Sequence, residues 1–276
     1  MTSLNLKKFD MTKVAKGSVC MMIGKRNTGK SFLTKDLLYY KRDIPIGTVI
    51  SGTEGANEFY SKIVPALFIH DEYSPEIISN SLKRQKIVVS KVNEQRRLHG
   101  KSNIDPNAFV ILDDCLYDNS WTKDTNMRTL FMNGRHYNVL LIITSQYSLG
   151  IPPNLRCNID FVFILRENII NNRKRLYDNY AGMFPSFEVF CQVMDQCTEN
   201  YECLVIDNTS KSNKIEDMVF WYKAENHPDF TMGSPQFWQH HSSNFKDKYG
   251  DDEDEDFSLT TGRKKNVPTI NVKKRF

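Results

Sequence analysis

The 276-residue sequence has no C-x-x-C pair, no long apolar run and no signal-peptide pattern. Because its six cysteines are scattered, it lacks the spacing of a disulfide framework or a familiar zinc finger. No apolar stretch approaches the roughly 20 residues that cross a bilayer, and the N-terminus lacks an apolar signal core. These absences predict a soluble chain in a reducing, intracellular compartment.

Charge is unevenly distributed along the chain. The net charge is only +4, but residues 251–256 are six consecutive acids. Without them, 37 basic residues face 27 acidic ones, an excess that attracts polyanions. Basic clusters follow at residues 263–265 and 273–275. We expect one large domain over residues 1–225 and a C-terminal extension over residues 226–276 that is largely disordered.

One segment near the N-terminus fits the phosphate-binding pattern G-x-x-x-x-G-K-[ST]. An apolar run of strand length precedes it, and apolar residues at helical spacing follow it. Backbone N–H groups of such a loop cradle the phosphates of ATP, its lysine reaches the β- and γ-phosphates, and its final hydroxyl binds Mg²⁺. The predicted nucleotide-binding residues are Gly24, Lys25, Arg26, Asn27, Thr28, Gly29, Lys30 and Ser31, with Ser31 also a metal ligand.

Apolar runs alternate with helical patterns along most of the chain. Nearly continuous apolar strands of this kind are covered on both faces in parallel sheets, which predicts a doubly wound α/β fold. Helices are expected at residues 76–99, 125–135 and 187–197, besides the one after the phosphate loop. Strands are expected at residues 18–23, 46–51, 66–70, 107–114, 139–144, 160–165, 202–206 and 218–222.

Polar residues that end apolar strands are candidate site residues, because ligands collect at the carboxyl ends of parallel strands. Asp113 suits the partner acid that holds Mg²⁺, directly or through water. The adjacent Asp114 suits a base that polarises the attacking water, although a turn-capping role is the alternative. Gln146 ends the next strand, where an amide can contact both the γ-phosphate and that water. Arg135 and Arg156 flank the same strand, and either is a candidate arginine finger for a neighbouring subunit.

Four segments together resemble the poxvirus-type DNA-packaging ATPases of nucleocytoplasmic large DNA viruses, a branch of the FtsK–HerA superfamily. They are MIGKRNTGKS, FVILDDCLYD, FMNGRHYNVLLIITSQY and IPPNLRCNIDFVF, which span roughly residues 18–165. Arg135 matches the Gly-Arg-His element of that family, and Arg156 matches a second arginine. Which of the two acts in trans stays open.

The resemblance implies a RecA-like (ASCE) P-loop NTPase: a Mg²⁺-dependent ATPase that moves double-stranded DNA into a capsid. It further implies a homo-oligomeric ring, expected to be a hexamer, in the infected-cell cytoplasm and the virion, with capsid or inner-membrane virion proteins as further partners. Clustered basic residues in the predicted helix 76–99 suit contacts to phosphates without sequence preference. A solvated helix face is the alternative for this cluster of Lys83, Arg84, Lys86, Lys91, Arg96 and Arg97.

Three other classes of protein share parts of this pattern. A P-loop nucleotide kinase would use the same cradle, with Asn171 to Arg175 as a basic lid. A GTPase is suggested by Asn213 to Glu216, close to N-K-x-D, but the final residue differs and no D-x-x-G follows the acidic strand. A non-catalytic binding module would leave the paired acids and Gln146 without a role.

Overall fold

The computed structural model describes residues 4–116, 119–147 and 151–245. Its contacts divide the chain between Asn244 and Phe245, and the fold described below is that of the first unit. The acidic run and the basic clusters lie outside the described residues, so their disorder stays a prediction. In the described part of the chain, no helix is both long and apolar enough to span a membrane.

The described residues form a nine-stranded, mostly parallel sheet in the order β1-β9-β8-β7-β2-β6-β5-β3-β4. Strand β8 runs antiparallel to both of its neighbours, and the other neighbouring pairs are parallel. The fold is therefore the predicted α/β fold. The strands are β1 (Lys7–Lys8), β2 (Val19–Ile23), β3 (Gly47–Ser51), β4 (Ile69–His70), β5 (Ala108–Asp113), β6 (Val139–Ser145), β7 (Phe161–Ile164), β8 (Glu202–Asp207) and β9 (Val219–Lys223).

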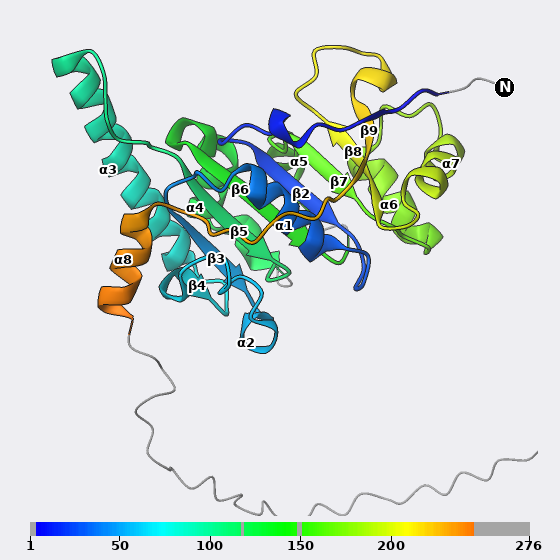
Figure 1. Cartoon of the computed structure of the whole chain (residues 1–276). Coiled ribbons are helices and arrows are strands. Elements are labelled where there is room, and N and C mark those ends of the chain that lie inside the picture. Colours follow the sequence, from blue (N-terminus) through cyan, green and yellow to red (C-terminus); the bar gives the residue numbers. More distant parts are fainter. Residues whose placement is uncertain (1–3, 117–118, 148–150, 246–276) are drawn as a thin grey trace, which may run out of the picture. The chain divides into compact units, whose positions relative to one another are not determined.

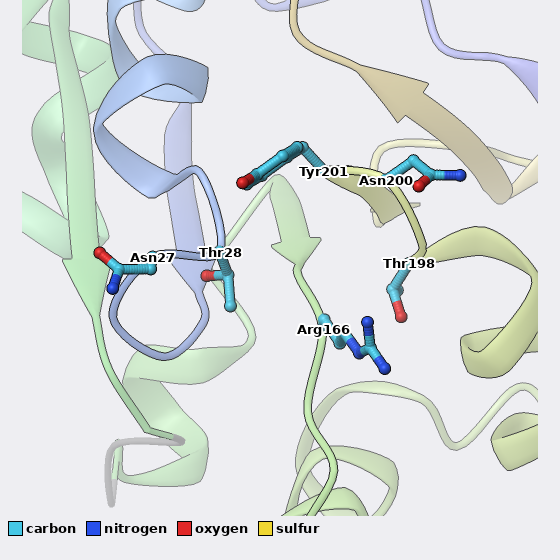
Figure 2. A pocket seen from close by; sticks show the side chains of 6 residues that line it. All are labelled: Asn27, Thr28, Arg166, Thr198, Asn200 and Tyr201. Atoms are coloured by element: carbon cyan, nitrogen blue, oxygen red, sulfur yellow. The ribbon is translucent and has the colours of Figure 1, made fainter.

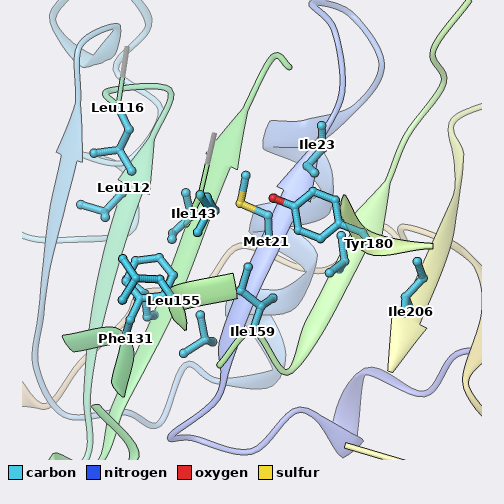
Figure 3. Packing of buried hydrophobic residues seen from close by; sticks show 14 of the residues in the cluster. Met21, Ile23, Leu112, Leu116, Phe131, Ile143, Leu155, Ile159, Tyr180 and Ile206 are labelled. Carbon is cyan, nitrogen blue, oxygen red and sulfur yellow. The ribbon is translucent and has the colours of Figure 1, made fainter. Parts of the chain in front are cut away.

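Helices cover both faces of the sheet. Because side chains alternate along a strand, Met21 and Ile23 of β2 pack on one face while Cys20 and Met22 pack on the other. Figure 3 shows part of the first of these two cores. Helices α3 (Pro75–His99), α4 (Thr125–Asn133), α5 (Pro153–Arg156), α6 (Ile170–Tyr180) and α7 (Phe187–Cys197) cover the first face. Helices α1 (Lys30–Tyr40) and α8 (Pro235–Asn244) contribute to the core of the second, and the short α2 spans Glu54–Asn57.

Local sequence explains where the longest helix begins and ends. The Ser74 side chain accepts a hydrogen bond from the Glu76 N–H, and Pro75 occupies the first turn, where no N–H is needed. The helix stops at Gly100, which adopts a left-handed conformation with φ of 73°. Figure 1 shows α3 running outward beyond the sheet, while α6 and α7 lie at the opposite side of the fold.

Two segments differ from what the sequence suggests. Residues 66–70 do not form one strand: Ala66–Phe68 is a 3₁₀ turn after Pro65, and only Ile69–His70 joins the sheet. Residues 226–244, assigned to the extension by sequence, include α8, and both Met232 and Phe237 are buried in the core. This segment therefore packs with the sheet, and the chain divides after it.

Candidate nucleotide site

The carboxyl ends of five strands meet along one edge of the sheet. The register places Ile23 of β2 opposite Ser145 of β6 and Ile164 of β7. One strand further along, Asp113 of β5 lies opposite Thr144 and Ser51. Strand β6 thus separates the strand that feeds the phosphate loop from the strand that ends in the paired acids. Residues that follow these strands share one edge, as parallel pairing requires.

The phosphate loop lies between the end of β2 and the start of α1, so the strand and helix that the motif requires are both present. Gly29 has a φ of 101°, which leads the chain into the helix. Gly24 has no room for a side chain: a Cβ there would lie 2.6 Å from Thr28 Oγ1 and 2.8 Å from Leu165 Cβ. Its N–H donates to the Ser145 carbonyl over 3.0 Å, which ties the loop to β6.

Lys30 faces the interior of the loop and the two acids. Its ammonium group donates to the carbonyl of Gly24 and, over 3.1 Å, to that of Lys25. Burial lowers the pKa of Lys30, while the nearby carboxylates of Asp114 and Asp113 oppose that shift. The cation is therefore half-buried and electrostatically coupled to both acids, as a phosphate-binding lysine beside a metal site would be.

Two hydroxyl side chains hold Asp113 at the end of the strand. Thr144 Oγ1 donates to one carboxylate oxygen, and Ser51 Oγ donates to the other over 3.2 Å. The buried phenol of Tyr60 lies beside the same group. Burial raises the pKa of Asp113, the three hydroxyl groups oppose that shift, and the Asp114 charge adds to it. The hydroxyl groups thus stabilise the ionised form, which is the form that binds Mg²⁺.

Asp114 and Gln146 contact each other at this edge. The Gln146 amide donates to Asp114 Oδ2, although 31 residues lie between them in the chain. Asp114 has a φ of 50°, which is uncommon for a residue other than glycine, and its N–H donates to the Thr144 carbonyl over 3.2 Å. The backbone is therefore held in a strained conformation at a polar site, which makes this residue a candidate for function.

Arg135 and Arg156 lie away from this edge. The Arg135 guanidinium pairs with Asp160 over 3.2 Å, and the same carboxylate accepts from the N–H of Val19, the first residue of β2. About 13 Å of strand separates Val19 from the phosphate loop. Arg156 lies just before β7 and donates to Asn179 near the end of α6. Neither arginine is thus brought to the site of its own chain.

Glu167 is a site neighbour that the sequence did not indicate. Its nearly buried carboxylate pairs with Lys25 of the phosphate loop over 2.6 Å and accepts from the N–H of Ile169 over 2.7 Å. Burial opposes ionisation, but the Lys25 ammonium and the other hydrogen bonds prevail and lower the pKa of Glu167. Lys25 therefore ties the loop to the segment that follows β7.

The basic stretch considered as a kinase lid is part of a packed helix. Residues 171–175 lie in α6, where Arg173 pairs with Asp195 of α7 over 2.6 Å and donates to the Glu167 carbonyl. A lid closes over a substrate only if it can move, and these contacts fix Arg173 to its neighbours.

A phosphate loop at the end of a parallel strand, beside paired acids across one strand, defines the fold as that of a P-loop NTPase. The chain matches no protein-family model. It is 39% identical to the uncharacterized protein L437 of Acanthamoeba polyphaga mimivirus over 98% of this chain and 96% of that protein. It is 41% identical to the uncharacterized protein 075L of Invertebrate iridescent virus 6 over 84% and 88% of the two chains. The chain belongs to the family that these viral proteins form.

A solved structure shares the fold. The genome packaging NTPase B204 of Sulfolobus turreted icosahedral virus 2, in complex with sulfate, superposes with a TM-score of 0.51. The alignment covers 78% of this chain and all of B204, at 13% sequence identity. At that identity the likeness concerns the fold alone.

Proposed function

We propose that the protein is a Mg²⁺-dependent ATPase that drives movement along double-stranded DNA for genome packaging. The observation that carries the ATPase part is the convergence of Lys30, Asp113, Asp114 and Gln146 on one edge of the sheet. Hydrolysis of a triphosphate requires a cation that binds the phosphates, a carboxylate that holds the metal and a second carboxylate that activates the water.

The residues present fit both ATP and Mg²⁺. Gly24 has no Cβ to clash with Thr28 and Leu165, and the exposed Ser31 lies in the first turn of α1. Ser31 and Asp113 would hold the ion as oxygen ligands, and the ion when bound neutralises charge on the β- and γ-phosphates. Asp114 would accept the proton of the attacking water, and Gln146, already bonded to Asp114, would orient that water.

The position of the two arginines supports a ring. Because Arg135 and Arg156 lie at the amino end of the strands, a finger from either would act on the site of another copy. We therefore propose a homo-oligomer, with a hexamer as the expected size. The relatives are viral proteins, and B204 is named a genome packaging NTPase, which supports a place in the infected-cell cytoplasm and the virion.

Helix α3 is the proposed contact to DNA. It runs outward from the sheet, and five of its basic side chains are exposed while Glu76 and Glu94 are its exposed acids. Long basic side chains on one extended helix contact phosphates irrespective of base sequence, as a translocase requires. These side chains are Lys83, Lys86, Lys91, Arg96 and Arg97.

The test compares ATP hydrolysis and nucleotide binding in two variants, with oligomer mass measured in the same samples. Lys30→Ala should lose binding and turnover, whereas Asp114→Asn should keep binding and lose hydrolysis. Duplex DNA should raise the rate of the wild type. Equal loss of binding in both variants contradicts the assigned roles, and phosphate transfer to nucleosides without hydrolysis would favour a kinase.

A further inference from the structure

A pocket of about 260 Å³ adjoins the phosphate loop on the side away from the paired acids. Asn27 and Thr28 of the loop form one wall. The remaining walls come from Arg166 after β7 and from Thr198, Asn200 and Tyr201 before β8. In Figure 2, Tyr201 and Arg166 lie on opposite sides of the space, with Thr28 between them on the loop side. The pocket therefore continues from the phosphate cradle.

The backbone at Tyr201, beside the pocket, has an unfavourable conformation. Its φ is 65° and that of Asn200 is 50°, so two consecutive residues are left-handed. Asparagine tolerates this conformation, but for a bulky residue such as tyrosine it is a genuine outlier that strains the backbone. The Tyr201 ring lies close to the loop: a Cβ on Gly29 would be 3.5 Å from its Cδ1.

Core packing does not account for the strain. The Tyr201 residue is 68% exposed, so it contributes little buried area to folding. Thr198, which precedes it in the chain, is buried and donates to the Met194 carbonyl over 2.6 Å, so the end of α7 is fixed. A strained backbone that presents an exposed aromatic ring over a phosphate loop is expected where the ring contacts a ligand.

We infer that Tyr201 is a stacking platform for the purine base of the bound nucleotide. This inference rests on the proposed ATPase function, because the phosphates in the loop bring the base to the pocket. The volume suits a base rather than a whole nucleotide, since sites for drug-sized ligands begin near 300 Å³. The Arg166 guanidinium lies on the opposite side, where a planar cation can face the base.

The experiment measures the affinity of the full-length protein for two ligands in the presence of Mg²⁺. One is a non-hydrolysable ATP analogue, and the other is inorganic tripolyphosphate, which has no base. Stacking of a base on an aromatic ring is worth about 1–3 kcal/mol. Tyr201→Asn should therefore lower the affinity for the ATP analogue about 5- to 150-fold. Its affinity for tripolyphosphate should not change. Tyr201→Phe keeps the ring and should bind both ligands as the wild type does.

Controls separate this inference from the proposed function. Asparagine accepts a positive φ, so Tyr201→Asn should melt no lower than the wild type. Lys30→Ala should lose both ligands. Unchanged affinity of Tyr201→Asn for the ATP analogue overturns the stacking role and leaves the phosphate site intact. Equal loss of affinity for both ligands also overturns the stacking role, because it shows that the substitution disturbs the phosphate loop itself. A wild-type protein that binds neither ligand overturns the proposed function, and the stacking role falls with it.

Discussion

Replacing Gly24 by alanine should disable the phosphate loop without unfolding the protein. The added Cβ would lie 2.6 Å from Thr28 Oγ1, and Thr28 cannot yield without losing its 2.7 Å hydrogen bond to the Lys25 carbonyl. Leu165 on the other side is fully buried and bonded through its N–H to Ile23. Overpacking costs about 1–3 kcal/mol and the lost hydrogen bond about 1 kcal/mol more. If the free loop relaxes to relieve about 2–4 kcal/mol of strain, it must regain that strain when nucleotide binds, which corresponds to at least about thirtyfold weaker binding.

The assay is titration of an ATP analogue, with thermal melting of the same samples. Gly55→Ala is the matched control, because a Cβ at Gly55 would meet nothing within 4 Å and Gly55 lies in the short helix α2. That variant should bind and melt like the wild type or melt slightly higher, since alanine favours a helix. If Gly24→Ala binds the analogue within about twofold of Gly55→Ala, the close packing of this loop does not govern binding.

Three further predictions concern the acid, the arginines and the basic helix. Thr144→Val removes a donor to Asp113, so the pKa of Asp113 should rise further and the acid limb of the ATPase pH profile should move to higher pH; an unmoved limb would mean that Asp113 is not the titrating group. Mixed with wild type, Arg135→Ala or Arg156→Ala subunits should lower the ATPase rate by more than their fraction, whereas a proportional fall argues against a finger in trans. Lys83→Gln with Lys86→Gln should reduce the salt slope of DNA binding by about 1.8, and an unchanged slope removes α3 from the interface.

The convergence of the site could be predicted because the chemistry lies at strand ends. Asp113 and Gln146 follow apolar runs of the sequence, and parallel pairing brings such positions to one edge. The same rule explains the arginines. Arg135 precedes β6, so it lies at the opposite edge, a consequence that the sequence already contained.

Tyr201 could not be found in this way. It precedes β8, and a residue before a parallel strand would lie at the far edge, away from the phosphate loop. Because β8 runs antiparallel to β7, its start lies beside the end of β7 and therefore beside the loop. The apolar sequences of β7 and β8 do not indicate the direction of either strand, because a buried strand has the same pattern in both orientations. The contact of Tyr60 with Asp113 likewise depends on tertiary packing of a loop that carries no motif.

The ion pair between Lys25 and Glu167 should stabilise the loop in a pH-dependent manner. Glu167→Gln keeps the shape of the side chain and removes its charge. The Glu167 side chain is 6% exposed, but that of Lys25 is 37% exposed, so solvent screening limits the expected loss to about 1–2 kcal/mol. For a domain of this size, that loss corresponds to a melting midpoint about 2–8 °C lower at pH 7.

The sign of the pH effect follows from the lowered pKa of Glu167. A carboxylate whose pKa is lower in the folded state adds stability above its unfolded value of 4.5, and that stability is lost as the pH falls through the folded pKa. The difference in midpoint between wild type and Glu167→Gln should therefore be constant above pH 5 and shrink in more acidic solution.

Asp178→Asn provides the control on the same segment, because the Lys174–Asp178 pair of α6 is about half exposed on both sides. Its midpoint should match that of the wild type at every pH. A difference for Glu167→Gln that persists undiminished at pH 3 would show that shape or packing, and not the charge on Glu167, holds the loop. At the acidic pH where this difference in midpoint disappears, the affinity of the wild type for nucleotide should also fall. Lys25 then no longer holds the cradle against the end of β7.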